Sequence, residues 1–164
     1  MELKGTDSLM KKLQEIAEKM DAGSVSVGFM AGATYPDGTG VPQVAFWNEF
    51  GTVNSPPRPF FRGMIAEESG TWPEKMAKLA KATHYDGEKV LGMMGEDIGG
   101  ALMQSIINLQ SPPLADSTVK ARIGNTKKYN AETVKKPLID TGHMVSSIDY
   151  QVNESGQVNI PYKG

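Results

Sequence analysis

The segment that most restricts the fold of this chain runs from about residue 86 to residue 109 and shows helical periodicity. Apolar residues recur every three or four positions along it, which predicts a long helix with one apolar face. The residues of that face are Leu91, Met94, Ile98, Ala101, Leu102 and Leu109. The rest of the chain therefore has to supply a surface that covers this face.

Three glycines lie along the edge of the apolar face, because Gly92, Gly95 and Gly99 are spaced at i, i+3 and i+7. Each glycine costs about 1 kcal/mol of helix propensity relative to alanine, so its presence inside a helix needs a reason. We expect that the glycines let a neighbouring element approach the helix closely. A conformational hinge in the helix is the alternative.

The other periodic segments predict an α+β fold. Helical spacing is found in segments 6–20, 43–50, 59–69 and 72–84, and the alternation typical of strands in segments 24–30, 146–152 and 157–162. Strands and helices are not regularly interleaved, so a small antiparallel sheet with helices packed on one face is favoured over alternating βαβ units. The length of 164 residues suits a single domain that spans residues 1–164.

Two segments, 31–42 and 110–137, are predicted to be long projecting loops. The first is rich in turn residues and suits either a hairpin tip or a flexible arm. The second has six basic and two acidic residues and a net charge of +4, whereas the whole chain has a net charge of −2. A solvated loop and an arm that touches DNA or an acidic neighbour both fit it. The negative net charge of the whole chain argues against a protein whose main role is to bind phosphate groups.

The triplet Asp140-Thr141-Gly142 follows two apolar residues, as the catalytic triplet of an aspartic protease does. Protease chemistry needs two carboxylates that share a proton, supplied by a second triplet or by a symmetric dimer, in a long all-β body. The segments before this triplet are mainly helical in pattern, which argues against a protease. We expect instead that a side-chain oxygen of Asp140 or Thr141 caps a short helix beginning at Gly142.

Other catalytic patterns are missing from the sequence. There is no cysteine, the only histidines are His84 and His143, and no P-loop, G-x-G-x-x-G, H-E-x-x-H or G-x-S-x-G motif is found. A histidine without neighbouring metal-ligating residues rarely belongs to a metal site. We therefore expect no catalytic residue, no cofactor and no metal site.

A second informative stretch is WNEFGT, residues 47–52. Gly51 is expected to take a backbone conformation that other residues resist. Trp47 and Phe50 are expected to bury a large apolar area beside that glycine.

The proline-rich stretch PPRPFFR, residues 56–62, follows shortly after and predicts a rigid extended connector. We expect that Glu49 and Arg58 form an ion pair that holds this connector against the body of the domain. Pro59 suits the first position of the next helix, which Phe60 and its neighbour would anchor.

Together with residues 136–152, KPLIDTGHMVSSIDYQV, these motifs resemble the tail-completion and neck proteins of double-stranded DNA phages. That group includes the Mu-like virion-morphogenesis proteins and the lambdoid minor tail protein Z. Its pattern is Asn-Glu-Phe-Gly-Thr, then Pro-x-Arg-Pro-Phe, a helical middle, and Leu-x-x-Thr-Gly-x-(Leu/Met)-x-x-Ser-Ile before a strand. The structural or interface candidates here are Trp47, Asn48, Glu49, Phe50, Gly51, Arg58, Pro59, Phe60, Asp140, Thr141, Gly142, Ser147 and Ile148.

The resemblance implies a structural virion protein that forms a ring of six or alternatively twelve copies at the phage neck or the top of the tail. Its neighbours would be portal, adaptor or head-closure proteins on one side and the tail tube or tail terminator on the other. Genomic DNA would pass through the lumen without specific binding, and neither a cofactor nor a membrane would be involved. Assembly would take place in the host cytoplasm.

A protein of another class is the alternative: a small DNA-binding or regulatory module that uses the basic segment 110–137. Binding of that kind would weaken steeply as the salt concentration rises.

Overall fold

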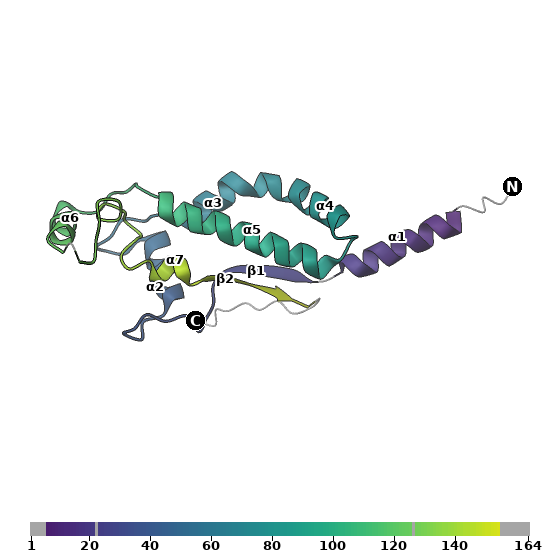
Figure 1. Ribbon diagram of the computed structural model, residues 1–164, viewed down its shortest axis with the longest axis horizontal. Helices are drawn as coiled ribbons and strands as arrows, with labels where there is room; N and C mark the ends of the chain where they lie inside the picture. The colour runs from purple at the N-terminus through teal and green to yellow at the C-terminus, as the bar shows by residue number, and fades with distance from the viewer. Residues whose placement is uncertain (1–5, 22, 126, 155–164) are drawn as a thin grey trace. The chain divides into compact units, whose positions relative to one another are not determined.

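The computed structural model describes residues 6–21, 23–125 and 127–154. It confirms the α+β prediction, because several helices accompany one two-stranded antiparallel sheet, in which β1 pairs with β2 (Figure 1). The chain divides into two compact units, and the second consists of Val27–Gly70 and Ile98–Asp149. The first unit holds the segments before, between and after these. The single domain spanning residues 1–164 stays a prediction.

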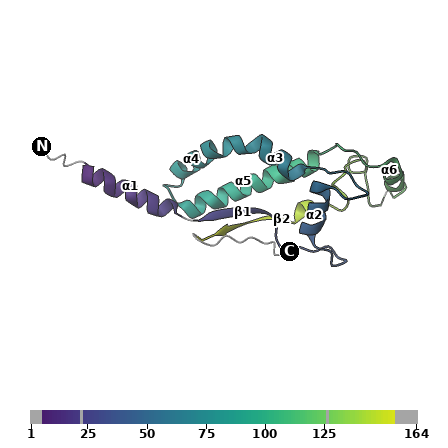
Figure 2. The ribbon, with the colours of Figure 1, turned by 180° about the vertical axis from the view of Figure 1, so that it is seen from behind.

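Unit 1 contains α1, α4 and the first part of α5. Its elements are α1 (Thr6–Met20), α4 (Trp72–Ala82), α5 (Gly87–Asn108) as far as Asp97, β1 (Ser24–Phe29) as far as Ser26, and β2 (Ile148–Asn153) from Tyr150 onward. Within this unit α4 and the beginning of α5 run side by side in both views (Figures 1 and 2).

Unit 2 contains the remaining parts of β1, β2 and α5 together with four shorter helices. These are α2 (Val41–Phe50), α3 (Phe60–Glu68), α6 (Asp116–Ile123) and α7 (His143–Ser146). A single 3-10 turn, η1 (Ser69–Thr71), follows α3. Ser105 of α5 donates a hydrogen bond of 2.7 Å to the carbonyl oxygen of Phe60, which ties the start of α3 to α5.

Most of the predicted elements are confirmed. The predicted helices 6–20, 59–69, 72–84 and 86–109 correspond to α1, α3, α4 and α5, and the predicted strand 24–30 corresponds to β1. α2 begins two residues earlier than predicted, at Val41, because Pro42 fits the first turn of a helix, where a backbone donor is dispensable. The strand predicted at 146–152 is β2, and the strand predicted at 157–162 lies outside the described residues.

Within segment 31–42, residues 34–40 form a hairpin turn, which decides between the two alternatives left open by the composition, and residues 41 and 42 belong to α2. Thr34 and Gly40 form an antiparallel bridge, and the Tyr35 N–H donates to the carbonyl oxygen of Thr39 at 2.8 Å. The Asp37 carboxylate accepts the Thr39 N–H at 2.9 Å and thereby closes the turn.

The prediction of close packing at the α5 glycines is confirmed at one of the three positions. A Cβ added at Gly95 would lie 2.5 Å from the ring of Tyr150 on β2 and 3.0 Å from Val25 on β1, so α5 rests directly on this part of the sheet. At Gly99 the nearest side-chain atoms would be 3.8 Å away, which is ordinary contact. At Gly92 nothing lies within 4 Å, and there the prediction is wrong.

Alanine substitutions at two of these glycines are expected to have effects of opposite sign. Gly95→Ala should lower the free energy of unfolding by about 1–3 kcal/mol, because the new methyl group overlaps the Tyr150 ring. Gly92→Ala should raise it by about 0.5–1 kcal/mol, because alanine favours the helix and meets open space. Urea unfolding followed by circular dichroism would measure both, and equal effects at the two positions would contradict the packing shown here.

The buried apolar residues lie mainly in unit 2. They include Val41 and Ala45 of α2, Phe60 and Met64 of α3, Leu102 and Ile106 of α5, and Leu138 and Met144 on either side of the triplet 140–142. In unit 1 the buried apolar side chains are Ala80, Val90 and Met94 on α4 and α5. The apolar face of α1 is different, because Leu9, Met10 and Leu13 are each more than half exposed.

Across the described parts of the chain, no helix combines the length and the apolar character needed to cross a bilayer.

Candidate assembly surface

Glu49 is the centre of a buried polar contact between α2 and α3. Its side chain is 6% exposed, and its carboxylate accepts the backbone N–H groups of Phe61 at 2.8 Å and of Arg62 at 3.1 Å. These donors belong to the first turn of α3, where no carbonyl within the helix is available to accept them. The positive end of the helix dipole further stabilises the carboxylate, so Glu49 serves as the N-terminal cap of a different helix.

The expected ion pair between Glu49 and Arg58 is wrong. Glu49 pairs with Arg62 instead, at 2.8 Å between Oε1 and Nε, and Arg62 also donates to the carbonyl oxygen of Glu49 at 3.1 Å. Arg58 is buried and donates to the carbonyl oxygens of Pro112 and Pro113 at 3.1 and 3.2 Å. Arg62, in the first turn of α3, reaches Glu49, whereas Arg58 lies before the helix begins.

Arg58 therefore joins two segments that are far apart in the sequence. Burial lowers the pKa of its guanidinium, and the nearby charge of Arg122 lowers it further. The backbone N–H of Arg58 donates to the carbonyl oxygen of Asn48 at 2.7 Å, and the Asn48 side chain donates to the carbonyl oxygen of Val44 at 2.9 Å. The connector is thus fastened to α2 on one side and to the segment before α6 on the other.

Gly51 ends α2 and has the unusual backbone conformation that its position in the sequence predicts. Its φ is +81° and its ψ is 173°, a region that is essentially restricted to glycine. A Cβ at this position would lie 2.8 Å from the nitrogen of Pro57 and 2.9 Å from the carbonyl oxygen of Ser55. The chain folds back tightly over Gly51, and this turn brings the proline-rich connector against α2.

The outer face of α2 is apolar and exposed, which corrects the expectation that Trp47 and Phe50 are buried. Trp47 is 43% exposed, Phe50 52% and Phe46 56%, and Val53 in the following turn is fully exposed. We call the three aromatic residues Phe46, Trp47 and Phe50 the aromatic patch. The rings of Phe46 and Phe50 lie 4.7 Å apart, and the guanidinium of Arg62 lies 4.7 Å from the centre of the Phe50 ring. The buried face of α2 is formed instead by Val41, Ala45 and Glu49.

The expectation that Phe60 anchors α3 agrees with its surroundings. Its side chain is almost completely buried, and its ring meets that of Phe29 on β1 edge to face at 6.3 Å. Pro59 is the residue immediately before α3, one position earlier than the helical position predicted for it.

Segment 110–137 contains helix as well as loop, which corrects its prediction as a loop throughout. α6 occupies Asp116–Ile123, and the chain after it folds around the buried side chain of Arg122. The guanidinium of Arg122 donates to the carbonyl oxygens of Thr133, Lys136 and Ile139 at 3.4, 2.9 and 3.0 Å. The hydrogen bonds of this one buried guanidinium therefore hold together a segment that has little regular secondary structure. No periodic pattern in the sequence predicts this role for Arg122.

Asp140 lies in the same network. It accepts hydrogen bonds from Lys128, at 2.8 Å, and from the hydroxyl of Tyr129, and the Arg122 guanidinium lies 3.8 Å from it. Of the two side chains expected to cap the next helix, Asp140 does not do so, and that helix begins at His143, one residue later than expected. Thr141 does reach that helix, since its hydroxyl oxygen accepts the N–H of His143 at 3.3 Å. Gly142 precedes α7 with a φ of +77°, in the left-handed region.

The last two candidate residues lie where α7 gives way to β2. The Ser147 hydroxyl donates to the carbonyl oxygen of His143 at 2.7 Å, and Ile148 begins β2. Ser146 also donates to that carbonyl, at 3.0 Å, while the Nε2 atom of His143 lies 2.8 Å from the carbonyl oxygen of Thr34. The His143 contact connects the segment to the hairpin turn at residues 34–40, and the serine hydroxyls act as structural donors.

The surroundings of Asp140 predict a specific pH dependence. Burial by itself would raise the pKa of Asp140, but hydrogen bonds from Lys128 and Tyr129 and the charges of Lys128 and Arg122 together hold it below the ordinary value of 3.8. The contribution of the ionised Asp140 carboxylate to the free energy of unfolding is therefore complete above about pH 4. It is lost as the pH falls through the lower pKa that Asp140 has in the folded state. In urea unfolding at several pH values, the stability difference between the wild type and Asp140→Asn should be constant near neutrality and should shrink below about pH 4.

Lys128→Met provides the matched control for Asp140. With the cation removed, the pKa of Asp140 should move back toward its ordinary value, and most of the difference in acid sensitivity should disappear. A difference that persists unchanged in the Lys128→Met background would contradict the assignment of the lowered pKa to this pair.

All of the candidate residues lie in unit 2, and the structure brings the members of each motif together. Sequence reasoning missed three contributors: Arg62, Arg122 and Phe46. The positions of Glu49 and Arg62 could have suggested their pairing, since Glu49 lies at the end of α2 and Arg62 lies in the first turn of the next helix, α3.

Within the described ranges, no cluster of three or more metal-ligating side chains is found. In comparisons with known proteins, no family model, no curated protein and no solved structure matches this chain.

Proposed function

We propose that this chain is a structural subunit of a phage particle, of the tail-completion or neck kind, that assembles with copies of itself into a ring. The proposal places the ring between the portal side of the head and the tail tube, with DNA passing through its lumen. The observation that carries the self-assembly part is the aromatic patch. The phage context rests on the sequence motifs, whose residues form the α2–α3 junction that supports this patch.

The aromatic patch has the properties of a protein–protein contact surface. Single exposed apolar residues are common, but three aromatic side chains gathered on one helix face suit the centre of an interface, where tryptophan and other aromatic residues are enriched. The helix that carries them is held from behind by Glu49, Gly51 and the connector. A surface that is already rigid loses little conformational entropy when it binds.

A closed ring requires that one surface patch of each copy meets a different patch of the next copy. The aromatic patch supplies one such surface, with the cation of Arg62 at its edge. Neighbouring virion proteins above and below the ring would contact other parts of the chain.

The DNA-binding alternative is less well supported, because several basic residues of segment 110–137 have partners inside the chain. Arg122 is buried against carbonyl oxygens, Lys128 pairs with Asp140, and the Lys136 amino group donates to the carbonyl oxygen of Ile107 at 2.9 Å. Half of the six cations are thus engaged in holding the segment together, which reduces the charge that is available for phosphates.

The proposal is tested by measuring the mass of the purified protein over a range of concentrations, together with electron microscopy of the particles. We expect closed rings of six or twelve copies for the wild type. The double variant Trp47→Ala/Phe50→Ala should stay folded, because both side chains are exposed, but should no longer assemble. Ile123→Ala is the matched control, since it shortens an exposed apolar side chain on α6 and should leave the rings intact.

Two results would overturn the proposal. One is a protein that stays monomeric at every concentration, with and without purified tail tube. The other is strong, salt-sensitive binding of that monomer to random duplex DNA, which would favour the DNA-binding module instead.

A further inference from the structure

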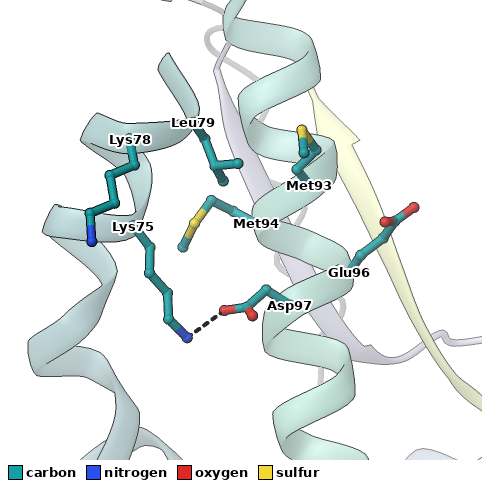
Figure 3. A pocket seen from close by; sticks show the side chains of 7 residues that line it. All are labelled: Lys75, Lys78, Leu79, Met93, Met94, Glu96 and Asp97. Carbon is teal, nitrogen blue, oxygen red and sulfur yellow. Dashed lines mark hydrogen bonds and ion pairs between the residues drawn. The ribbon is translucent and has the colours of Figure 1, made fainter. Parts of the chain in front are cut away.

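The groove of about 570 Å³ between α4 and the first part of α5 has apolar walls, but its charged side chains are already engaged. All four of them have partners within the chain, as the ion pair of 2.8 Å between Lys75 and Asp97 illustrates (Figure 3). This groove therefore offers no free charge to a ligand.

A cavity of about 390 Å³ beside α6 in unit 2, which we call the α6 cavity, has a different lining. Its walls are mainly apolar, and one buried cation contributes to them. The residues that line it are Arg122, Ile123, Tyr129, Asn130, Ala131 and Val134. The volume lies in the range of small-molecule sites, which combine apolar walls with a small number of polar groups.

The guanidinium of Arg122 keeps hydrogen-bonding capacity in spite of its burial. Its side chain is 9% exposed, and its hydrogen bonds to carbonyl oxygens all leave from the Nη1 atom. Among the described residues, Nε and Nη2 have no hydrogen-bond acceptor, because Oδ1 of Asp140 lies 3.8 Å from Nη2. The N–H groups on Nε and Nη2, which form one edge of the guanidinium fork, are therefore free to bind an anion.

The surroundings of this guanidinium are short of negative charge. Asp140 brings a carboxylate to the cluster, but Lys128, at 2.8 Å, and the Tyr129 hydroxyl bind it directly. The buried cation of Arg58 lies close enough for the charge of Arg122 to lower its pKa. The cluster thus contains three cations and one carboxylate, and an additional anion would be favoured there.

We propose that the α6 cavity binds a carboxylate that is attached to an apolar group. The carboxylate accepts two charge-assisted hydrogen bonds from the Nε–Nη2 edge of Arg122, the geometry in which arginine and carboxylates pair most strongly. The apolar group lies against Ile123 and Val134, where the burial of apolar area adds affinity. A free organic acid and the C-terminal carboxylate of a peptide both present this chemistry. The site goes beyond the proposed structural role and does not depend on ring formation.

Titration of the full-length protein with three probes, followed by heteronuclear NMR, tests both halves of the ligand. Hydrocinnamate is expected to bind with a Kd of about 1 mM and to shift the signals of Ile123, Ala131 and Val134. Hydrocinnamamide, which has the same shape but no charge, should bind about tenfold more weakly or worse, and so should acetate, which lacks the apolar group. Equal affinities for the acid and the amide, or shifts confined to other residues, would overturn the proposal.

A substitution at the exposed Ala131 tests the location of the site. Ala131→Trp places a large ring in the lining of the α6 cavity and should abolish hydrocinnamate binding without unfolding the protein. Ala121→Trp is the matched control, because Ala121 is also exposed but lies on α6 outside the lining, and it should bind as the wild type does. A folded Ala131→Trp variant with unchanged affinity would show that the ligand binds elsewhere.

The role of charge can be tested without replacing Arg122, whose hydrogen bonds hold its segment together. Asp140→Asn removes the carboxylate that lies 3.8 Å from Nη2 and competes for the same cation. The affinity for hydrocinnamate should rise by about fivefold, whereas that for hydrocinnamamide should not change. An affinity for the acid that falls or stays constant in the folded variant would contradict pairing with Arg122.

A short peptide that ends in phenylalanine distinguishes the two sources of the carboxylate. With a free C-terminus it should bind, and with an amidated C-terminus it should not. Tighter binding of the free peptide than of hydrocinnamate would identify a chain terminus as the natural ligand, and weaker binding a free organic acid. If neither the peptide nor hydrocinnamate binds, the proposal is refuted, whatever the protein's oligomeric state.

Discussion

Gly51→Ala is expected to lower the free energy of unfolding by about 3 kcal/mol or more. Two costs combine at this position. Its φ of +81° with a ψ of 173° is hardly accessible to alanine, and the new Cβ would lie 2.8 and 2.9 Å from backbone atoms of Pro57 and Ser55. Backbone atoms of a proline-rich turn cannot move aside as a flexible side chain can. Urea unfolding followed by circular dichroism at 222 nm measures the loss.

Gly38→Ala separates the two costs. Gly38 also has a positive φ, +86°, but nothing lies within 4 Å of the position where its Cβ would be. We expect a loss of about 1–2 kcal/mol there, from the backbone conformation alone. A Gly51→Ala loss no larger than that of Gly38→Ala would mean that the connector does not close over Gly51 as the structure shows.

Glu49→Gln is expected to have the second largest effect, a loss of about 2–3 kcal/mol. The substitution preserves the shape of the side chain, but the amide presents a donor where the carboxylate accepts the N–H groups of Phe61 and Arg62. At least one buried backbone donor is then left unsatisfied at the start of α3, and hydrogen bonds to a charged group are the stronger kind. Thermal and urea unfolding of the variant would measure the loss.

Arg62→Gln is the matched control for Glu49. It removes the ion pair but leaves both backbone donors to the carboxylate in place, and the Arg62 side chain is 57% exposed. We therefore expect a loss of no more than about 1 kcal/mol. If Arg62→Gln proves as costly as Glu49→Gln, the ion pair rather than the helix cap is the dominant contact at this junction.

Both expected losses concern the support of the aromatic patch rather than the patch itself. Gly51→Ala and Glu49→Gln should therefore weaken self-association in proportion to the loss of folded protein. Trp47→Ala/Phe50→Ala should weaken it with the fold intact. This contrast separates residues that position the surface from residues that form it.

The helices other than α6 could be predicted from the sequence, and for the longer ones the reason is that their apolar residues repeat with a period that the backbone imposes. The same holds for β1, where apolar and small residues alternate, and for the turn at Gly51, where a helix stops abruptly before prolines. The sequence also argues against an aspartic protease at residues 140–142, because the segments before the triplet are mainly helical in pattern. These inferences depend only on neighbours along the chain.

The partners of the charged side chains could not be predicted in the same way. Glu49 was expected to pair with Arg58 because both flank the connector. In the structure Glu49 pairs with Arg62 at the start of α3, and Arg58 donates to the carbonyl oxygens of Pro112 and Pro113. Arg122 collects three carbonyl oxygens from residues 11 to 17 positions away. Nothing in the local pattern distinguishes it from an exposed cation.

The sequence by itself determined most of the helical and extended segments and where the chain has to turn, because these properties follow from local sterics and from the period of apolar residues; α6, which has no such period, is the exception. The tertiary structure alone decided which apolar residues are covered. Trp47 and Phe50 are as apolar as Phe60, but Glu49 and Ala45 occupy the inner face of α2 and leave the aromatic rings outside. The hydrophobicity of a side chain means that its burial is favourable. Only the positions of the neighbouring elements show whether the same chain covers that side chain or leaves it exposed for a partner to cover.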